Sequence, residues 1–357
     1  MKKVFLFDPT TLSYREKIYD FFISEFSKYG VDLYIYYEKE KCNIQKDKYI
    51  GIEYTFKSFK ELHKNEKPDV SIFFIWLSYT FSIPFLAYLR LFSKTKSIVW
   101  SKGINITNIN QPFKNQIYYL RQRLADALIL YSEFEKQFII TNKEKVFVAN
   151  NTINNKCYNT EISGEEVIRF KQELSIKENK VVLFVGRIEK RKNVDILLEV
   201  FSRELNGIAL LIVGPGLSHT QEEIIKGASN IYATGAIYDI ERLSLCYQLA
   251  DIFCIPGHLG LGINEAFLFG VPVVTENMSN SNDLVSSEPM MLFKDNYNGL
   301  FFNGNANDLS EKLELLANNN ELRDSFSENA RKTFQDRALI EYMRDGFLKS
   351  IKYVTNE

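Results

Sequence analysis

Two short segments of the sequence combine residue types that bind an anionic, hydroxylated ligand. Residues 187–193, RIEKRKN, place four cations within six positions, directly after the apolar run VVLFVG. Cations at the junction of a strand and a helix, beside the positive end of the helix dipole, form a natural site for a pyrophosphate. A solvated basic turn would have the same composition. We expect Arg187 and Lys192 to point toward a ligand, and Lys190 and Arg191 to lie at the surface.

The second segment, GHLGLGINEAFLFGVPVV over residues 257–274, contains a single acid, Glu265. The preceding run ADIFCIPG predicts a strand, HLGLGI a loop whose amides can approach a ligand closely, and NEAFLFG the start of a helix. A carboxylate in the first turn of that helix could accept hydrogen bonds from two neighbouring hydroxyls, as a ribose presents them. Stabilisation of the acid by the helix dipole is the alternative reading of the same position.

Alternating apolar strands and amphipathic helices must position these two segments. Strand runs are predicted at 4–7, 31–37, 69–76, 97–100, 125–132, 181–187, 208–214, 250–257 and 271–275. Helices are predicted after the loop DPTTLSYR, at 193–205 with Asn193 as the N-cap, and at 309–319 and 321–334. Such alternation predicts parallel sheets covered on both faces. The predicted fold class is therefore α/β, with two doubly wound Rossmann-like domains facing a central cleft, where a ligand would bind.

Length and charge both favour two domains. A chain of 357 residues exceeds one ordinary hydrophobic core. Residues 1–150 hold 23 Lys+Arg and 16 Asp+Glu, a net +7, and residues 151–357 hold 21 and 29, a net −8, which together give the −1 of the chain. The polar segment NNTINNKCYNT predicts the linker. We expect domains at 1–153 and 154–335, and a final helix at 336–357 that crosses back to the first domain.

Composition narrows the function classes further. The four cysteines form no CxxC pair and no histidine lies at metal-ligand spacing, so neither a zinc site nor a disulfide framework is predicted, and a reducing cytosol fits best. The apolar run in the first ten residues, MKKVFLFDPT, is too short for a signal peptide. The stretch 70–92 is long enough for a transmembrane helix, but its polar interruptions favour a buried strand followed by a helix.

The order and spacing of these motifs resemble a known family. GRIEKRKN, PGHLGLGINEA and GVPVV are similar to motifs of the retaining GT-B glycosyltransferases of glycosyltransferase family 4, over roughly residues 146–335. In the first half, YREKIYDFF, WSKG and ILYSEFEK resemble a bacterial polysaccharide-assembly branch of that family. The resemblance implies that the C-terminal domain binds a nucleotide-diphosphate sugar, most simply a UDP- or GDP-sugar, and that the N-terminal domain binds a glycan acceptor.

The resemblance also implies roles for individual residues. Arg187 and Lys192 match the basic pair that holds the donor diphosphate, and Glu265 matches the second acid of the E-x7-E motif, which binds the ribose. The other donor-binding positions match backbone that meets the sugar, the phosphates or the base: Gly186, Leu259, Gly260, Leu261, Ala236 and Ile237. Gly257 stands where the family has the first acid, a contact to the donor sugar. His258 could replace that contact or lie in solvent.

On the acceptor side, the resemblance points to the loop after the first strand and to the end of the strand SIVW. Thr11, Tyr14 and Arg15 belong to the first, and Lys102 lies where relatives place a basic or imidazole group near the reacting sugar. Arg15 and Lys102 could instead be ordinary surface cations. The implied reaction is front-face attack, in which the protein positions the substrates and stabilises the leaving diphosphate. The sequence has no Asp-x-Asp motif, so we predict no metal and no cofactor.

The acceptor domain also has an unusual charge distribution. Residues 70–125 contain seven basic residues, twelve aromatic residues and no acid. Basic and aromatic side chains together suit an anionic membrane surface, although a solvated, partly buried face would look the same. Nucleic acid is not predicted, because no recognition motif accompanies the charge. We therefore expect a cytoplasmic enzyme, peripheral on the inner face of the cell membrane, that extends a lipid-linked glycan in surface polysaccharide biosynthesis.

Two other function classes fit parts of the sequence. Gly257 is compatible with a catalytically silent sugar-nucleotide-binding partner of another glycosyltransferase, which would bind nucleotide without turnover. A nicotinamide dehydrogenase shares the doubly wound architecture. However, the loop DPTTLS has no glycine, and Gly214 and Gly216 are not followed by the third glycine of the dinucleotide fingerprint.

Overall fold

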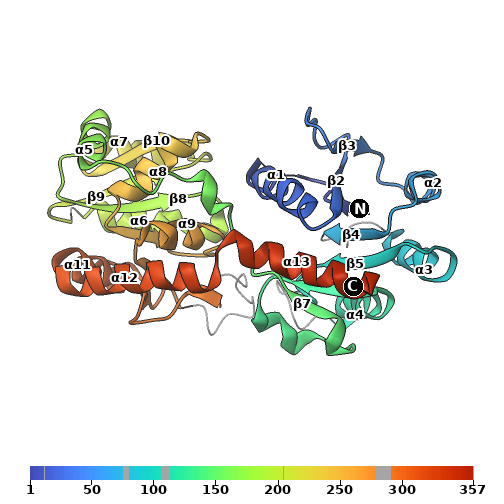
Figure 1. Ribbon diagram of the computed structural model, residues 1–357. Helices are drawn as coiled ribbons and strands as arrows, with labels where there is room; N and C mark the ends of the chain where they lie inside the picture. Colours follow the sequence, from blue (N-terminus) through green and yellow to red (C-terminus); the bar gives the residue numbers. More distant parts are fainter. Residues whose placement is uncertain (12, 75–79, 106–111, 204, 278–290, 357) are drawn as a thin grey trace. The chain divides into compact units, whose positions relative to one another are not determined.

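The computed structural model describes residues 1–11, 13–74, 80–105, 112–203, 205–277 and 291–356, which form two compact units (Figure 1). The first unit contains Met1–Asn154 and the chain from Leu339 onward. Of the described residues, the second contains 155–277 and 291–338. The chain thus passes from one unit to the other within the asparagine-rich segment 150–160 and returns just before its last helix.

The first unit is built on a parallel sheet whose described strands run in the order β3-β2-β1-β4-β5-β6-β7. The strands are β1 (Lys2–Phe7), β2 (Val31–Glu38), β3 (Tyr49–Ile52), β4 (Val70–Phe74), β5 (Lys96–Trp100), β6 (Ala127–Leu130) and β7 (Val146–Val148). The helices are α1 (Ser13–Ser27), α2 (Phe56–Glu66), α3 (Ser82–Phe92), α4 (Pro112–Leu124) and α13 (Ile340–Thr355). Short 3-10 turns at Glu133–Phe138 and Lys143–Lys145 join β6 to β7.

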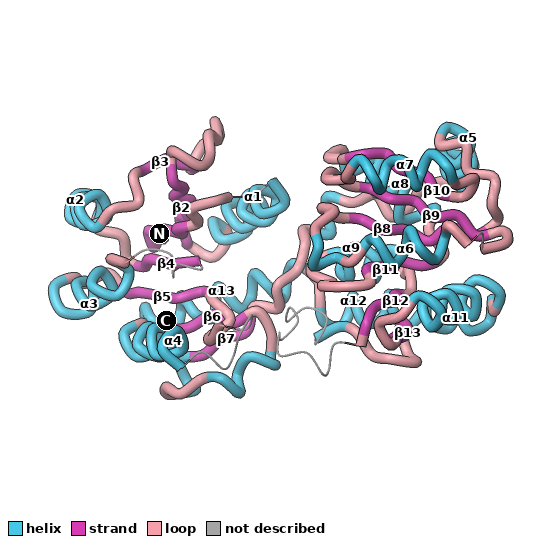
Figure 2. Tube along the Cα trace, turned by 180° about the vertical axis from the view of Figure 1, so that it is seen from behind, coloured by secondary structure: helices cyan, strands magenta, loops and turns pink. Residues whose placement is uncertain are grey.

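The central strand β1 shows why helices cover both faces of this sheet. Its side chains alternate between two cores: Val4 and Leu6 belong to one, and Phe5 and Phe7 to the other. The first core contains residues of α1 and α13, and the second contains residues of α2 and α3. Figure 2 shows these helices on either side of the strands. A strand that is apolar on both faces is typical of a buried parallel sheet.

The last helix packs against the first unit at very short range. A Cβ atom on Gly346 would lie 2.4 Å from the carbonyl oxygen of Val148, so only glycine allows α13 to approach β7 this closely. Arg344 adds an ion pair of 3.0 Å with Glu25 of α1. The C-terminal helix is thus held to the N-terminal sheet by packing and by charge.

The second unit is a parallel sheet whose described strands run in the order β10-β9-β8-β11-β12-β13. The strands are β8 (Lys180–Val185), β9 (Ile208–Val213), β10 (Ile231–Gly235), β11 (Ile252–Ile255), β12 (Val273–Glu276) and β13 (Gly299–Phe302). The helices are α5 (Gly164–Glu173), α6 (Val194–Phe201), α7 (His219–Gly227), α8 (Ile240–Leu249), α9 (Gly262–Phe269), α11 (Ala306–Asn318) and α12 (Asn320–Arg337). A 3-10 turn, Asn155–Cys157, opens the unit.

The prediction of two doubly wound α/β domains is confirmed by these two parallel sheets. The short strands β3, β7 and β13 were not predicted, because none of them carries a long apolar run. The loop after β1 is shorter than expected. Helix α1 begins at Ser13, so Tyr14 and Arg15 lie in its first turn and not in a loop.

Both sheets have a switch point, where the order of the strands reverses. It lies between β1 and β4 in the first unit and between β8 and β11 in the second. In open α/β sheets, ligands bind outside the carboxyl ends of the strands at this point. The residues that directly follow these four strands are therefore the candidates for function.

The apolar stretch 70–92 forms β4 and α3 in its described parts. Throughout the portion of the chain that the structure describes, no helix combines the length and the apolar composition required to cross a membrane.

The buried histidine of the first unit gives a prediction for stability. His63 bonds the Phe59 carbonyl and the Ser71 hydroxyl, both at 2.8 Å, and burial lowers its pKa from 6.5 to about 4. Between these values the unfolded chain binds a proton that the folded chain does not, so stability falls as the pH drops through this window. The loss approaches about 3 kcal/mol.

Urea unfolding followed across this pH window tests the assignment. The His63→Gln variant should have a smaller slope than the wild type, whereas replacing the exposed His219 by Gln should leave the slope unchanged. Equal slopes in the wild type and in His63→Gln would contradict it.

Candidate functional site

The residues that follow β8 form a tight basic turn. Gly186 has a φ of +150°, and nothing lies within 4 Å of the place where its Cβ would be, so its backbone is open to a ligand. Lys190–Lys192 form one 3-10 turn, and α6 begins at Val194. Asn193 occupies the N-cap position as predicted, but it is left-handed and its side chain makes no capping bond.

The four cations of this turn have different environments. Arg187 and Lys190 are exposed, and Arg191 pairs with Glu189 at 2.7 Å. Lys192 is half-buried, and its ammonium donates to the carbonyl oxygens of His258 and Leu259, the latter at 3.2 Å. Lys192 therefore reaches the glycine-rich loop, while the other three lie toward solvent.

Backbone hydrogen bonds also connect the basic turn to the glycine-rich loop. The amide of Gly257 donates to the Lys192 carbonyl at 3.1 Å, and the amide of His258 donates to the Arg191 carbonyl at 2.8 Å. These bonds connect the end of β11 to the turn after β8, across the switch point of the second sheet. The structure thus brings together two segments that lie more than sixty residues apart in sequence.

These hydrogen bonds explain why position 257 has no acid. A Cβ atom there would lie 2.2 Å from the Arg191 carbonyl oxygen and 3.0 Å from the Lys192 carbonyl carbon. No side chain fits without separating the two segments. Gly257 is therefore a consequence of the close approach of two backbones, and a glutamate is incompatible with this geometry.

Glu265 lies in the first turn of α9, and its carboxylate is held by two tyrosines. The hydroxyl of Tyr158 donates to Oε1 at 2.5 Å, and that of Tyr247 donates to Oε2 at 2.9 Å. Burial raises the pKa of both tyrosines, and the negative charge of Glu265 raises them further. Both hydroxyls therefore keep the proton that they donate.

These tyrosines were not predicted. Tyr158 lies in the polar segment that reads as a linker, and Tyr247 lies in α8, where an aromatic residue is typical of ordinary core packing. No spacing connects either of them with Glu265. The only signal in the sequence was the isolation of the acid itself.

The remaining predicted donor residues lie at the same edge of the second sheet. Leu259 is buried, and His258 and Leu261 are half-buried. Gly260 has a φ of +64°, and its Cβ position lies 3.5 Å from the ammonium of Lys192. Ala236 and Ile237 follow the edge strand β10, two strands from β8, which corresponds to about 10 Å along the sheet. The structure thus groups the loop with Lys192 and places the β10 residues farther along.

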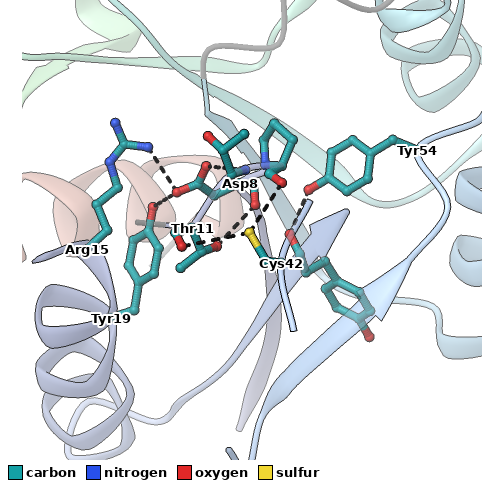
Figure 3. Close-up of polar contacts among 9 residues, drawn as sticks. Asp8, Thr11, Arg15, Tyr19, Cys42 and Tyr54 are labelled. Carbon is teal, nitrogen blue, oxygen red and sulfur yellow. Dashed lines mark hydrogen bonds and ion pairs between the residues drawn. The ribbon is translucent and has the colours of Figure 1, made fainter. Parts of the chain in front are cut away.

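At the switch point of the first unit, Asp8 forms the centre of a buried cluster (Figure 3). Its carboxylate accepts hydrogen bonds from the Thr10 amide at 3.3 Å, from Arg15 Nη1 at 3.0 Å and from the Tyr19 hydroxyl at 2.8 Å. The Arg15 guanidinium carbon also lies 3.8 Å from the ring centre of Phe74, at the end of β4. Burial disfavours the charge on Arg15, but Asp8 and nearby tyrosines raise its pKa above the ordinary value.

This cluster corrects the view of Arg15 as a surface cation. Its side chain is 13% exposed and is held by an internal carboxylate, whose importance the sequence analysis missed. Thr11 is buried, and its hydroxyl donates to the Asp8 carbonyl at 3.2 Å. Tyr14 is 36% exposed. Lys102 is half-buried, with its ammonium 5.1 Å from the ring centre of Tyr131.

Metal-ligating side chains do not gather in the described parts of either unit. No group of three or more His, Cys, Asp or Glu residues that could hold an ion occurs among the residues that the structure covers.

The two parallel α/β sheets define the fold of the chain as GT-B. The whole chain superposes on a glycosyltransferase from Rickettsia africae with a TM-score of 0.77 at 16% identity, covering 100% of this chain and 99% of that one. HepE of Anabaena, crystallised with UDP, gives a TM-score of 0.75 at 14% identity, covering 99% and 100%.

Residues 166–333 match the sequence profile of the glycosyl transferases group 1 family. This segment of the second unit is a glycosyltransferase family 4 sequence, and the chain is similar to glycosyltransferases of bacterial surface polysaccharide synthesis. The family and the enzyme class predicted from the sequence are both confirmed.

Three relatives illustrate this relationship. An uncharacterized glycosyltransferase of Haemophilus influenzae is 28% identical over 78% of this chain and 75% of its own. The capsular polysaccharide biosynthesis glycosyltransferase CapM of Staphylococcus aureus is 26% identical, over 66% and 64%. An N,N'-diacetylbacillosaminyl-diphospho-undecaprenol alpha-1,3-N-acetylgalactosaminyltransferase of Campylobacter jejuni is 24% identical, over 64% and 63%. The matched region thus spans under two thirds of the second and third relatives.

The close approach at Gly257 predicts a specific mutational effect. Gly257→Ala forces a methyl group against the Arg191 carbonyl and should destabilise the second unit by about 1–3 kcal/mol. Gly164, which has open space at its Cβ position, supplies the matched control Gly164→Ala. Chemical denaturation measures both variants, and a Gly257→Ala protein as stable as the wild type would refute the packing argument.

Proposed function

We propose that the protein transfers a sugar from a nucleotide-diphosphate sugar to a lipid-linked glycan acceptor, with retention of anomeric configuration and without a metal ion. The proposal rests on one observation: the cationic turn at Lys192 is hydrogen-bonded to the glycine-rich loop, and Glu265 lies in the helix that follows this loop. A diphosphate needs cations and amides, and a ribose needs an acceptor for its hydroxyls. These groups occur together at one switch point.

Comparison with relatives supports the substrates. HepE binds UDP on the same fold, which favours a uridine donor. The Campylobacter relative is named for a diphospho-undecaprenol acceptor, and CapM for capsule synthesis. We infer a lipid-linked glycan acceptor of surface polysaccharide synthesis for this chain. Tyr14 and Lys102, at the carboxyl edge of the first sheet, are the candidate acceptor-side contacts.

The proposed reaction exchanges one bond to the anomeric carbon for another. The acceptor hydroxyl oxygen bonds to this carbon as the bond to the donor phosphate oxygen breaks, and the electron pair remains on the diphosphate. The acceptor proton passes to a donor phosphate oxygen on the same face. Arg187, Lys192 and the first amides of α9 stabilise the charge that develops.

Arg187 supplies the sharpest test of this assignment, because Lys192 also holds the loop. Arg187→Ala should lower kcat about 10²- to 10³-fold, the scale of one lost charge-stabilising donor. Arg191→Ala removes a cation of the same turn that pairs with Glu189, and it should leave kcat nearly unchanged. Sugar transfer from UDP- and GDP-sugars is the measurement, and equal loss in both variants would reject the specific role of Arg187.

The metal-free mechanism has its own test. Transfer or donor hydrolysis should survive dialysis against EDTA, because fixed cations take the place of a metal ion. Activity that disappears with EDTA and returns with Mg²⁺ or Mn²⁺ would contradict the mechanism. Nucleotide binding without turnover on any acceptor would instead favour the catalytically silent partner that Gly257 suggested.

The second part of the proposal is that the protein binds a membrane surface through helix α4. This helix buries polar side chains and exposes apolar ones, which is the reverse of an ordinary surface helix. Its buried positions hold polar residues, Asn115, Arg121 and Gln122, while Phe113, Ile117 and Leu120 are 89%, 40% and 39% exposed. Arg121 Nη2 bonds the Ser82 hydroxyl at 2.6 Å and Gln122 Nε2 bonds the Gly103 carbonyl at 2.8 Å, so the polar face is anchored inward.

The exposed apolar face of α4 has cationic and apolar neighbours. Leu91 and Phe92, at the end of the adjacent α3, are 70% and 76% exposed. The exposed cations nearby in sequence are Arg90, Lys94, Lys96 and Arg123. An outward apolar face bordered by cations fits an anionic bilayer, where a lipid-linked acceptor would be found.

Replacing Phe113, Ile117 and Leu120 together by serine should reduce binding to phosphatidylglycerol vesicles more than about tenfold, because each large apolar side chain contributes about 1.5 kcal/mol or more on leaving water. Ile168→Ser, at an exposed apolar position of the second unit, is the control. Vesicle co-sedimentation measures both, and unchanged binding of the triple variant would exclude this face.

A further inference from the structure

We propose that Tyr158 and Tyr247 form a clamp that presets the two oxygens of the Glu265 carboxylate to receive two vicinal hydroxyls, so that the donor site selects ribonucleotides over 2'-deoxyribonucleotides. The inference rests on the proposed function, in which Glu265 meets the nucleotide sugar. It adds two positioning residues and a specificity to that site.

The geometry of the clamp is bidentate. Each tyrosine hydroxyl occupies a different carboxylate oxygen, Oε1 for Tyr158 and Oε2 for Tyr247. The plane and the rotation of the carboxylate are therefore both fixed. A carboxylate oxygen can accept two hydrogen bonds, so one tyrosine does not by itself fill either oxygen.

Aromatic packing keeps the two tyrosines in place. Tyr247 is fully buried and stacks on Phe269, with ring centres 5.6 Å apart at an angle of 8°. Tyr158 meets the same Phe269 ring edge-on at 6.2 Å. Phe269 lies one helical turn after Glu265 in α9, so a single helix carries both the carboxylate and the ring that orients its two partners.

Preorganisation is the physical consequence. A free glutamate side chain loses rotamer freedom when it is ordered by a ligand. The clamp removes most of this loss before the ligand arrives, so the bound hydroxyls gain the full effect of their hydrogen bonds. A ligand that lacks one of the two hydroxyls leaves one preset oxygen with its tyrosine donor alone, so the deoxy analogue binds with one hydrogen bond fewer.

The opposing explanation is that the tyrosines only satisfy a half-buried acid. Their hydroxyls would then matter for stability and not for the choice between ribose and deoxyribose. The ratio of affinities for a nucleotide and its 2'-deoxy analogue separates the two explanations, because a purely structural loss changes both affinities alike.

Titration calorimetry with UDP, GDP and their 2'-deoxy analogues makes the test. The wild type should bind the ribonucleotide at least about tenfold more tightly. Tyr158→Phe and Tyr247→Phe should each lower this ratio about 3- to 10-fold, the scale of one ordinary hydrogen bond, and leave the affinity for inorganic pyrophosphate unchanged. Tyr232→Phe, which removes a tyrosine–glutamate bond of 3.0 Å to Glu178 in the same unit, should change neither.

Two results would overturn the clamp, and they are distinguishable. If both variants keep the wild-type ratio while their unfolding midpoints fall, the tyrosines are structural and the proposed function stands. If the wild type binds neither UDP nor GDP, the proposed function fails and the clamp fails with it. Circular dichroism of each variant confirms that a changed ratio belongs to folded protein.

Discussion

The contact between the backbone of Gly257 and the basic turn is the constraint on which the donor side depends. Two amide hydrogen bonds and the Lys192 ammonium join the ends of β8 and β11. This contact sets where α9 begins and therefore where Glu265 lies. It also gives Lys192 two tasks, since the cation that is proposed to meet the diphosphate also holds the loop carbonyls. The Lys192 side chain therefore determines both the charge of the basic turn and the position of the glycine-rich loop.

At both switch points a carboxylate accepts hydrogen bonds from tyrosine hydroxyls, but the other partners of the two carboxylates differ. In the first unit, Asp8 receives the guanidinium of Arg15 and the hydroxyl of Tyr19, so its charge is neutralised inside the fold. In the second unit, Glu265 receives two neutral tyrosine hydroxyls, one on each carboxylate oxygen. The first cluster holds its carboxylate with a cation and a hydroxyl, while the second fixes the orientation of its carboxylate from both oxygens.

Local patterns predicted most of the fold and only part of the site. Apolar runs such as IALLIV and the alternation of strands with helices define both sheets, because burial on two faces leaves a clear signature in sequence. The cations after β8 and the acid of α9 were identifiable, since their positions relative to predicted elements are local features. Tyr158 and Tyr247 were not, because their contact with Glu265 spans 107 and 18 residues and follows no period. Arg15 was predicted as an acceptor-side residue, with a surface cation as the alternative, and its ion pair with Asp8 was not predicted, because the sequence marks Asp8 only as the end of a strand.

The glycine at position 257 shows why the departure from the E-x7-E motif is not a simple loss. A side chain there would collide with the Arg191 carbonyl, so an acid could return only if the two amide bonds that fasten the loop were given up. Those bonds hold the carbonyls that Lys192 contacts. In this chain, an acid at position 257 and the hydrogen bonds between the glycine-rich loop and the cationic turn exclude each other. The sequence has glycine at this position, so the hydrogen bonds form. If the donor binds here as proposed, its sugar meets the backbone and neighbours such as His258, a set of contacts different from that of family members with both acids.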